Sequence, residues 1–130
     1  MKSKSKYTKA ERAIMRELAT EAWDAELNAA LSELYEEFCR WAEHGMSSFE
    51  LSDRIHAFHD GIARELYKRY TVLGTSSSVA RAVALGLIGA DALPEALAEK
   101  LATEIAFFRE LADELSAEQG SQADAGKFGG

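Results

Sequence analysis

The sequence is poor in the residues that interrupt or cross-link a chain. Of its 130 residues, only Cys39 is a cysteine and only Pro94 is a proline. A single cysteine excludes an intrachain disulfide framework. Scarce proline and abundant alanine favour helix, because these residues have the highest and the lowest cost in a helix interior. No β-branched run alternates with polar residues between turn signals, so strands are not indicated. We therefore expect an all-α protein.

Positive charge is also scarce. Lys and Arg total 15 against 22 Asp and Glu, which gives a formal net charge of −7. Proteins that bind nucleic acid or a membrane surface usually carry a basic excess, so the composition argues against both partners. The longest run of apolar residues and glycine, residues 82–90, is far shorter than the roughly 20 residues that cross a bilayer. The N-terminus lacks the apolar region of a signal peptide, and we expect a cytoplasmic protein.

The ends of the chain differ from its middle. Residues 1–7 form a basic arm of alternating Lys and Ser, and residues 117–130 are rich in glycine and lack helical periodicity. We expect both segments to be flexible tails. The apolar content of 47% and the length of the remainder, residues 8–116, suit one helical domain.

Start and stop signals define a pair of long helices. Thr8 and Glu11 have the spacing of a capping box, which predicts a helix from Thr8 to His44 with Gly45 in the left-handed position after it. Ser47 is a strong N-cap for a second helix, Ser48 to Leu73. A connection this short usually joins antiparallel neighbours, so we expect a long helical hairpin.

Two shorter segments complete the expected fold. Val79 to Ile88 is apolar on every side except at Arg81, as a helix inside a core would be. A last helix is expected from Pro94 to Leu115, because proline is favoured at the first helical position. The fold class predicted from the sequence is thus a four-segment helical bundle with an antiparallel N-terminal hairpin.

The apolar stripe of the first helix changes sides near residues 20–25. Its later part carries six large apolar residues on one face: Trp23, Leu27, Leu31, Leu34, Phe38 and Trp41. Steps of about 100° per residue place an earlier set almost opposite: Ile14, Met15, Leu18, Ala22 and Ala25. Either the helix breaks in this region or the earlier part packs on something else. We expect Ile14, Met15, Leu18 and Ala22 to form a homodimer interface, because they would otherwise be an unexplained apolar patch.

One alternative is a metal-dependent helical enzyme or metal-binding protein. His56, His59 and Asp60 are the closest group of metal-capable side chains, and imidazole and carboxylate suit zinc or non-haem iron. The chain has no Glu-x-x-His pair of the kind found in di-iron bundles, however. The simpler interpretation is that both histidines are surface or capping residues, so we predict no metal and no cofactor.

A further alternative is a phosphate or anion site. Ser76, Ser77 and Ser78 precede a predicted helix, and Arg81 lies one turn inside it. Free backbone N–H groups at a helix start attract anions. The simpler interpretation is a serine linker, with Arg81 paired to an internal carboxylate such as Glu104.

These patterns favour binding over catalysis. We expect a small interaction or oligomerisation module that self-associates and binds or regulates an unidentified protein partner. The sequence assigns no catalytic residue, and it leaves open whether the chain has an enzymatic activity.

Overall fold

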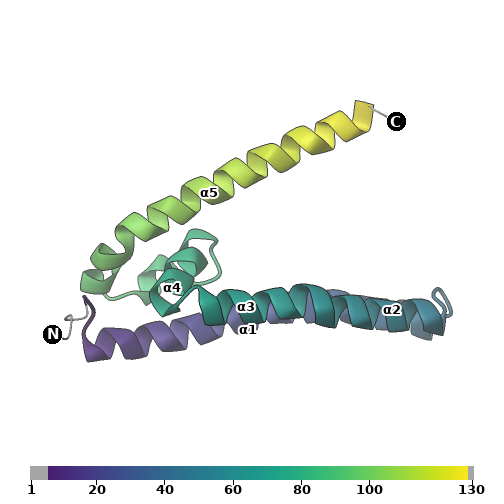
Figure 1. The fold of residues 1–130 in the computed structure, drawn as a ribbon, viewed down its shortest axis with the longest axis horizontal. Coiled ribbons are helices and arrows are strands. Elements are labelled where there is room, and N and C mark those ends of the chain that lie inside the picture. The colour runs from purple at the N-terminus through teal and green to yellow at the C-terminus, as the bar shows by residue number, and fades with distance from the viewer. Residues whose placement is uncertain (1–5, 129–130) are drawn as a thin grey trace.

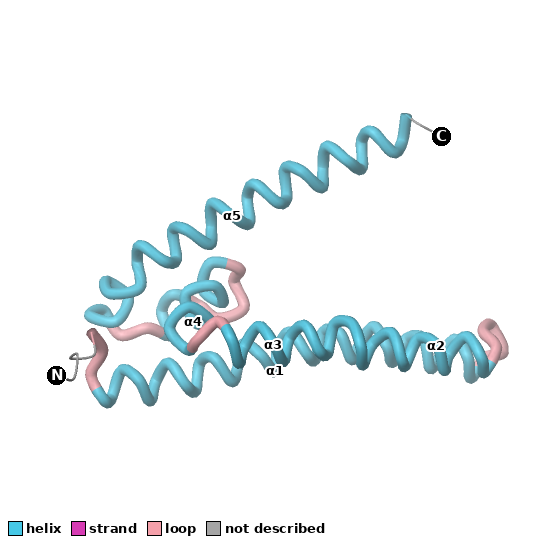
Figure 2. The backbone as a smooth tube through the Cα atoms, in the orientation of Figure 1, coloured by secondary structure: helices cyan, strands magenta, loops and turns pink. Residues whose placement is uncertain are grey.

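The computed structural model describes the backbone of residues 6–128 and the side chains of residues 6–119. Every regular element in that part of the chain is helical, as the sequence predicts (Figures 1 and 2). The elements are α1 (Lys9–Ala42), α2 (Ser48–Phe58), a π-helical segment η1 (His59–Ala63), α3 (Arg64–Val72), α4 (Thr75–Ala84), a short 3₁₀ turn η2 (Ala90–Ala92) and α5 (Glu95–Phe128). None of the helices described has the length and apolarity needed to cross a bilayer.

Helix α1 begins as predicted and runs without a break. The Thr8 hydroxyl accepts from the Glu11 N–H, and the Glu11 carboxylate accepts from the Thr8 N–H, which together make the capping box. The possible break near residues 20–25 does not occur. At the other end, His44 and not Gly45 has the left-handed conformation, with φ 66°. At Gly45 the chain passes close to Arg40, and a Cβ there would lie 3.0 Å from the Arg40 Cγ, a tight contact.

The chain turns after α1, and α2, η1 and α3 run back beside it (Figure 1). The Ser47 hydroxyl caps α2 by accepting from the Glu50 N–H, as the sequence predicts. The returning segment is not one regular helix, because His59–Ala63 forms a π turn in which hydrogen bonds span five residues. We refer to α2, η1, α3 and the adjoining second half of α1, Leu27–Ala42, as the long arm.

Helix α4 differs from the predicted third segment at both ends. It starts at Thr75 and stops at Ala84, so the three serines belong to its first turns and not to a linker. Gly74 precedes it with φ 92°, a conformation that favours glycine. Gly86, with φ 77°, lets the chain leave the helix before Ile88.

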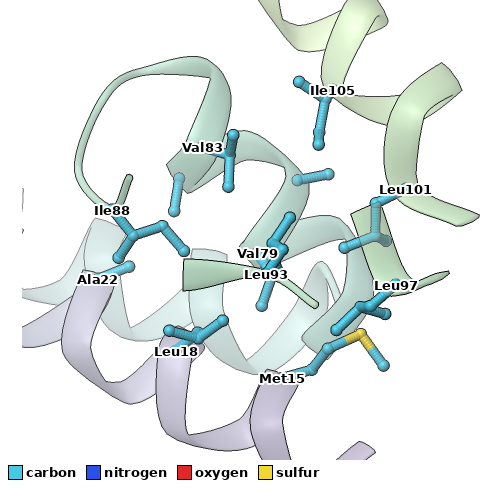
Figure 3. Close-up of a cluster of buried hydrophobic side chains, with 12 residues drawn as sticks. Met15, Leu18, Ala22, Val79, Val83, Ile88, Leu93, Leu97, Leu101 and Ile105 are labelled. Atoms are coloured by element: carbon cyan, nitrogen blue, oxygen red, sulfur yellow. The ribbon is translucent and has the colours of Figure 1, made fainter. Parts of the chain in front are cut away.

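The core is assembled from the first half of α1, from α4, from the start of α5 and from the loop between the last two (Figure 3). Helix α4 lies between α1 and α5 and packs on both. The largest buried apolar side chains include Val79, Leu97 and Leu101, each 0% exposed. At its edge, the Lys100 ammonium lies 2.6 Å from the Glu11 carboxylate. This ion pair and the capping hydrogen bond from Thr8 lower the pKa of Glu11 below its usual value.

The predicted subunit interface is wrong. Met15, Leu18 and Ala22 are 2%, 7% and 0% exposed, because α4 and α5 of the same chain cover them, and Ile14 packs against the same cluster (Figure 3). The change of apolar face along α1 is real, but its cause is intramolecular. The first half of α1 faces the core, and the second half faces α2 and α3.

The predicted flexible tail is also wrong over most of its length. Helix α5 continues through residues 117–128, while residues 129–130 lie outside the described part. No proline interrupts this stretch, and its alanines and glutamines favour helix despite Gly120 and Gly126. In Figure 1 the second half of α5 leads away from the other helices. Of the predicted basic arm 1–7, residues 1–5 are outside the described part.

Candidate functional site

The residues suggested as metal ligands do not form a site. His56 lies on α2, and His59 and Asp60 begin the π segment, with all three side chains exposed. Within residues 6–119, no three His, Cys, Asp or Glu side chains come close enough to hold a metal ion. The arrangement gives no support to the metal-enzyme alternative.

Two of the four residues suggested as an anion site, Ser77 and Arg81, have partners within the chain. The Ser77 hydroxyl donates to the Glu104 carboxylate at 2.9 Å, and the Arg81 guanidinium donates to Glu26 at 3.0 Å. The predicted Arg81–Glu104 pair is therefore wrong, because Arg81 pairs with Glu26 and Glu104 accepts a hydrogen bond from Ser77. The Ser78 hydroxyl is buried without a hydrogen-bond partner.

A hollow of about 250 Å³ lies beside the start of α4. Thr75 and Ser76 line one side, and Arg12 and Arg16 of α1 contribute to its lining. Arg12 also donates to the Tyr7 carbonyl oxygen at 2.7 Å. The hollow brings two arginines near the predicted serines, but Arg81 does not contribute to it.

Glu26 is the centre of a polar network that joins three helices. Its carboxylate accepts from Arg81 on α4 at 3.0 Å, and from Tyr70 and Arg69 on α3 at 3.1 and 3.3 Å. Trp23 stacks on the Tyr70 ring, with centroids 5.5 Å apart. Burial, reinforced by the Glu26 charge, raises the pKa of Tyr70 to about 12. The network fixes the base of the long arm to the core and leaves Arg81 no role as an external anion receptor.

The most distinctive surface is an uncharged face on the long arm. Leu31, Tyr35 and Phe38 follow one another at helical spacing on α1 and are 46%, 64% and 40% exposed. Steps of about 100° place them in one arc with the uncharged Asn28, Cys39 and Ala42. The four charged residues of this half-helix lie on the other side: Glu33, Glu36, Glu37 and Arg40.

Helix α2 has the same division. Ile55, 39% exposed, shares an arc with Ser48, Ser52 and His59, none of which is acidic or a permanent cation. Arg54, in contrast, lies with Glu33 and Glu37 along a groove of about 310 Å³ between α1 and α2. The charged sides of both helices thus meet at this groove. Their uncharged arcs therefore meet on the opposite side of the arm.

Two further residues mark the extent of this uncharged face. Cys39 lies on it as an exposed free thiol, and its hydrogen bond with Tyr35 raises the pKa of the Tyr35 phenol. Tyr67 of α3, 60% exposed, lies outside it, because Tyr67 lines a hollow with Asp60 and Arg64. The uncharged face is therefore confined to α1 and α2.

This face was not predicted as a site. The sequence pattern assigned Leu31 and Phe38 to a buried stripe, and Tyr35 was not considered. The signal that could have revealed the face was the absence of charge beside that stripe, since an ordinary solvent-facing arc carries charged residues. Comparison of the chain with protein-family models, curated proteins and solved structures finds no match.

Proposed function

We propose that the protein is a small helical interaction module that forms a homodimer through the uncharged face of its long arm. The arm acts as an antiparallel helical hairpin, and two hairpins pack face to face. The observation that carries this proposal is an exposed face without Asp, Glu, Lys or Arg in a chain in which these residues make up 28%. Depletion of charge and enrichment of aromatic residues characterise the centres of protein interfaces.

The lack of cover on the long arm supports association. Leu31, Tyr35 and Phe38 remain 46%, 64% and 40% exposed, because α2 and α3 cover only one side of this half of α1. An interface of standard size buries roughly 800 Å² on each partner.

Electrostatics limits a second copy to the uncharged face. Two copies with a net charge of −7 each repel one another over most of their surfaces. The uncharged face is where self-contact brings no like charges together. A two-fold axis through this face would place the same residues on both sides, as in most homodimers.

The proposed role is binding, without a catalytic step. The dimer would bind or regulate another protein through surfaces that remain open after pairing. The free thiol of Cys39 suits a reducing compartment, and we propose that the protein acts in the cytoplasm.

The proposal is tested by the mass in solution. Sedimentation equilibrium of the natural chain should give twice 14.3 kDa. Phe38→Glu places a charge on the face and should give the monomer mass, because burying an unpaired carboxylate is costly. The matched control is Phe49→Glu, which changes an 85% exposed phenylalanine near the tip of the arm and should leave the dimer intact.

Tyr35→Glu provides a second test, since Tyr35 is 64% exposed and its replacement should not disturb folding. Circular dichroism checks that each variant retains its helices. A natural chain that stays monomeric at high concentration would refute the proposal. Loss of the dimer in Phe49→Glu as well, or its survival in both Phe38→Glu and Tyr35→Glu, would also refute it.

A further inference from the structure

The apolar face of α5 extends beyond the core that it enters. Leu97, Leu101 and Ile105 are buried on this face. Steps of about 100° keep Leu111 and Leu115 on the same side of the helix. These two leucines are 40% and 51% exposed. The helix therefore presents an apolar stripe where the chain itself supplies no core.

Among the elements of residues 6–128, none covers this stripe on the second half of α5. Helix α5 packs mainly on α4, and Figure 1 shows its later part diverging from α1, α2 and α3. A free helix of about 20 residues is only marginally stable in water, because most helical stability comes from packing. The stripe thus lies on an element that gains stability when another surface covers it.

The charges near the stripe indicate which charge a surface that covers it should carry. Between Phe107 and Gln119, one arginine stands against four acidic residues, a net charge of −3. The five residues are Arg109, Glu110, Asp113, Glu114 and Glu118. A second α5 would bring two such acidic segments together, which is unfavourable.

The second half of α1 is no better match. Glu33, Glu36 and Arg40 follow Met15, Leu18 and Ala22 by eighteen residues each, which is five helical turns. They therefore point to the side of α1 on which α4 and α5 lie. With Glu37 beside them, this side carries three acids and one base, so closing α5 onto it would again oppose like charges.

We propose that the second half of α5 docks a basic amphipathic helix of another protein. The apolar stripe of that helix would cover Leu111 and Leu115, and its Lys and Arg residues would lie beside Glu114 and Glu118, the two acids that flank these leucines at helical spacing. This mode of recognition pairs the apolar faces of two helices and uses flanking charges to select the partner. The surface is separate from the uncharged face of the long arm and does not require the homodimer.

The test uses the full chain and two synthetic helical peptides of about three heptads each. Both carry Leu at the a and d positions, and they differ only in having Lys or Glu at e and g. Fluorescence anisotropy at about 0.15 M salt should give a Kd at least about tenfold lower for the Lys peptide. The preference should shrink at about 1 M salt, where charges are screened within about 3 Å.

Substitution locates the binding surface. Leu111→Gln/Leu115→Gln should weaken binding of the Lys peptide about tenfold or more, because it removes the apolar stripe. The matched control is Val72→Gln, which changes an 82% exposed residue of α3 and should have no effect. Reversing Glu114 and Glu118 to Lys should transfer the preference to the Glu peptide.

Three results would overturn the proposal. The first is equal binding of the two peptides, or binding of neither. The second is an equal loss of binding in Val72→Gln. The third is a smaller solution mass for peptide-free Leu111→Gln/Leu115→Gln, which would show that a second copy occupies α5. Circular dichroism of each variant confirms that the compared proteins are folded.

Discussion

The two halves of α1 have very different surroundings. In the first half, Met15 and Ala22 are 2% and 0% exposed, because α4 and α5 lie over them. In the second half, Leu31 and Phe38 are 46% and 40% exposed, although they are at least as apolar. The difference lies in the number of neighbouring helices. Two helices side by side cover only the seam between them, whereas a third layer covers a whole face.

The largest expected effect comes from one substitution made in both regions. Leu101→Ala should lower the free energy of unfolding by about 3–5 kcal/mol, because Leu101 is 0% exposed and its truncation leaves a cavity. Leu31→Ala should cost less than about 1 kcal/mol at concentrations where the chain is monomeric, because water already reaches the side chain. Urea unfolding monitored by circular dichroism measures both values.

Protein concentration sharpens this comparison. If the long arm pairs as proposed, the cost of Leu31→Ala should grow with concentration, because stability is then linked to association. The cost of Leu101→Ala should change much less. Equal costs for the two substitutions in the monomer would contradict the division into a covered core and an open arm.

The second prediction concerns the junction between the regions. Glu26→Ala should cost about 2–4 kcal/mol, because it leaves the partly buried Arg81 without its carboxylate and Tyr70 without its acceptor. The matched control is Glu104→Ala, which removes one hydrogen bond from Ser77 and should cost about 1 kcal/mol. Similar values from urea unfolding would show that Glu26 does not join the core to the arm.

The smallest effect is a change in an alkaline titration. The unfolded chain releases the Tyr70 proton near pH 10 and the folded chain near pH 12, so the free energy of unfolding should fall as pH rises across this interval. Ultraviolet absorbance should show two of the four tyrosines, Tyr35 and Tyr70, ionising late, and the step near pH 12 belongs to Tyr70. Tyr70→Phe should remove this late step. Glu26→Gln should lower its midpoint but keep it above 10, because burial is the larger cause.

Local signals were the most predictable part of this fold. The caps at Thr8 and Ser47 depend on side chains within one helical turn, and both form as predicted. The change of apolar face along α1 was also visible, because helical geometry fixes the direction of each side chain. The all-helical class followed from composition for the same kind of local reason.

The identity of the covering element could not be predicted in this way. A helical wheel shows which way Met15 and Leu18 point but not what lies there, and α4 and α5 occupy that space instead of a second copy. The same limitation applied to Arg81, since its partner Glu26 is 55 residues away in sequence. The candidate surface was missed because burial of Leu31 depends on how many helices surround it.

The π segment η1 changes the direction in which the side chains of α3 point relative to those of α2. Leu51 and Tyr70 are nineteen residues apart, so an unbroken α-helix would turn them about 100° away from each other. The wide π turn contains one additional residue, which cancels this offset. Both side chains can therefore face α1. Shortening the turn by a single residue would rotate α3 as a unit, and Tyr70 would lose its hydrogen bond to Glu26 together with the buried position of Leu66.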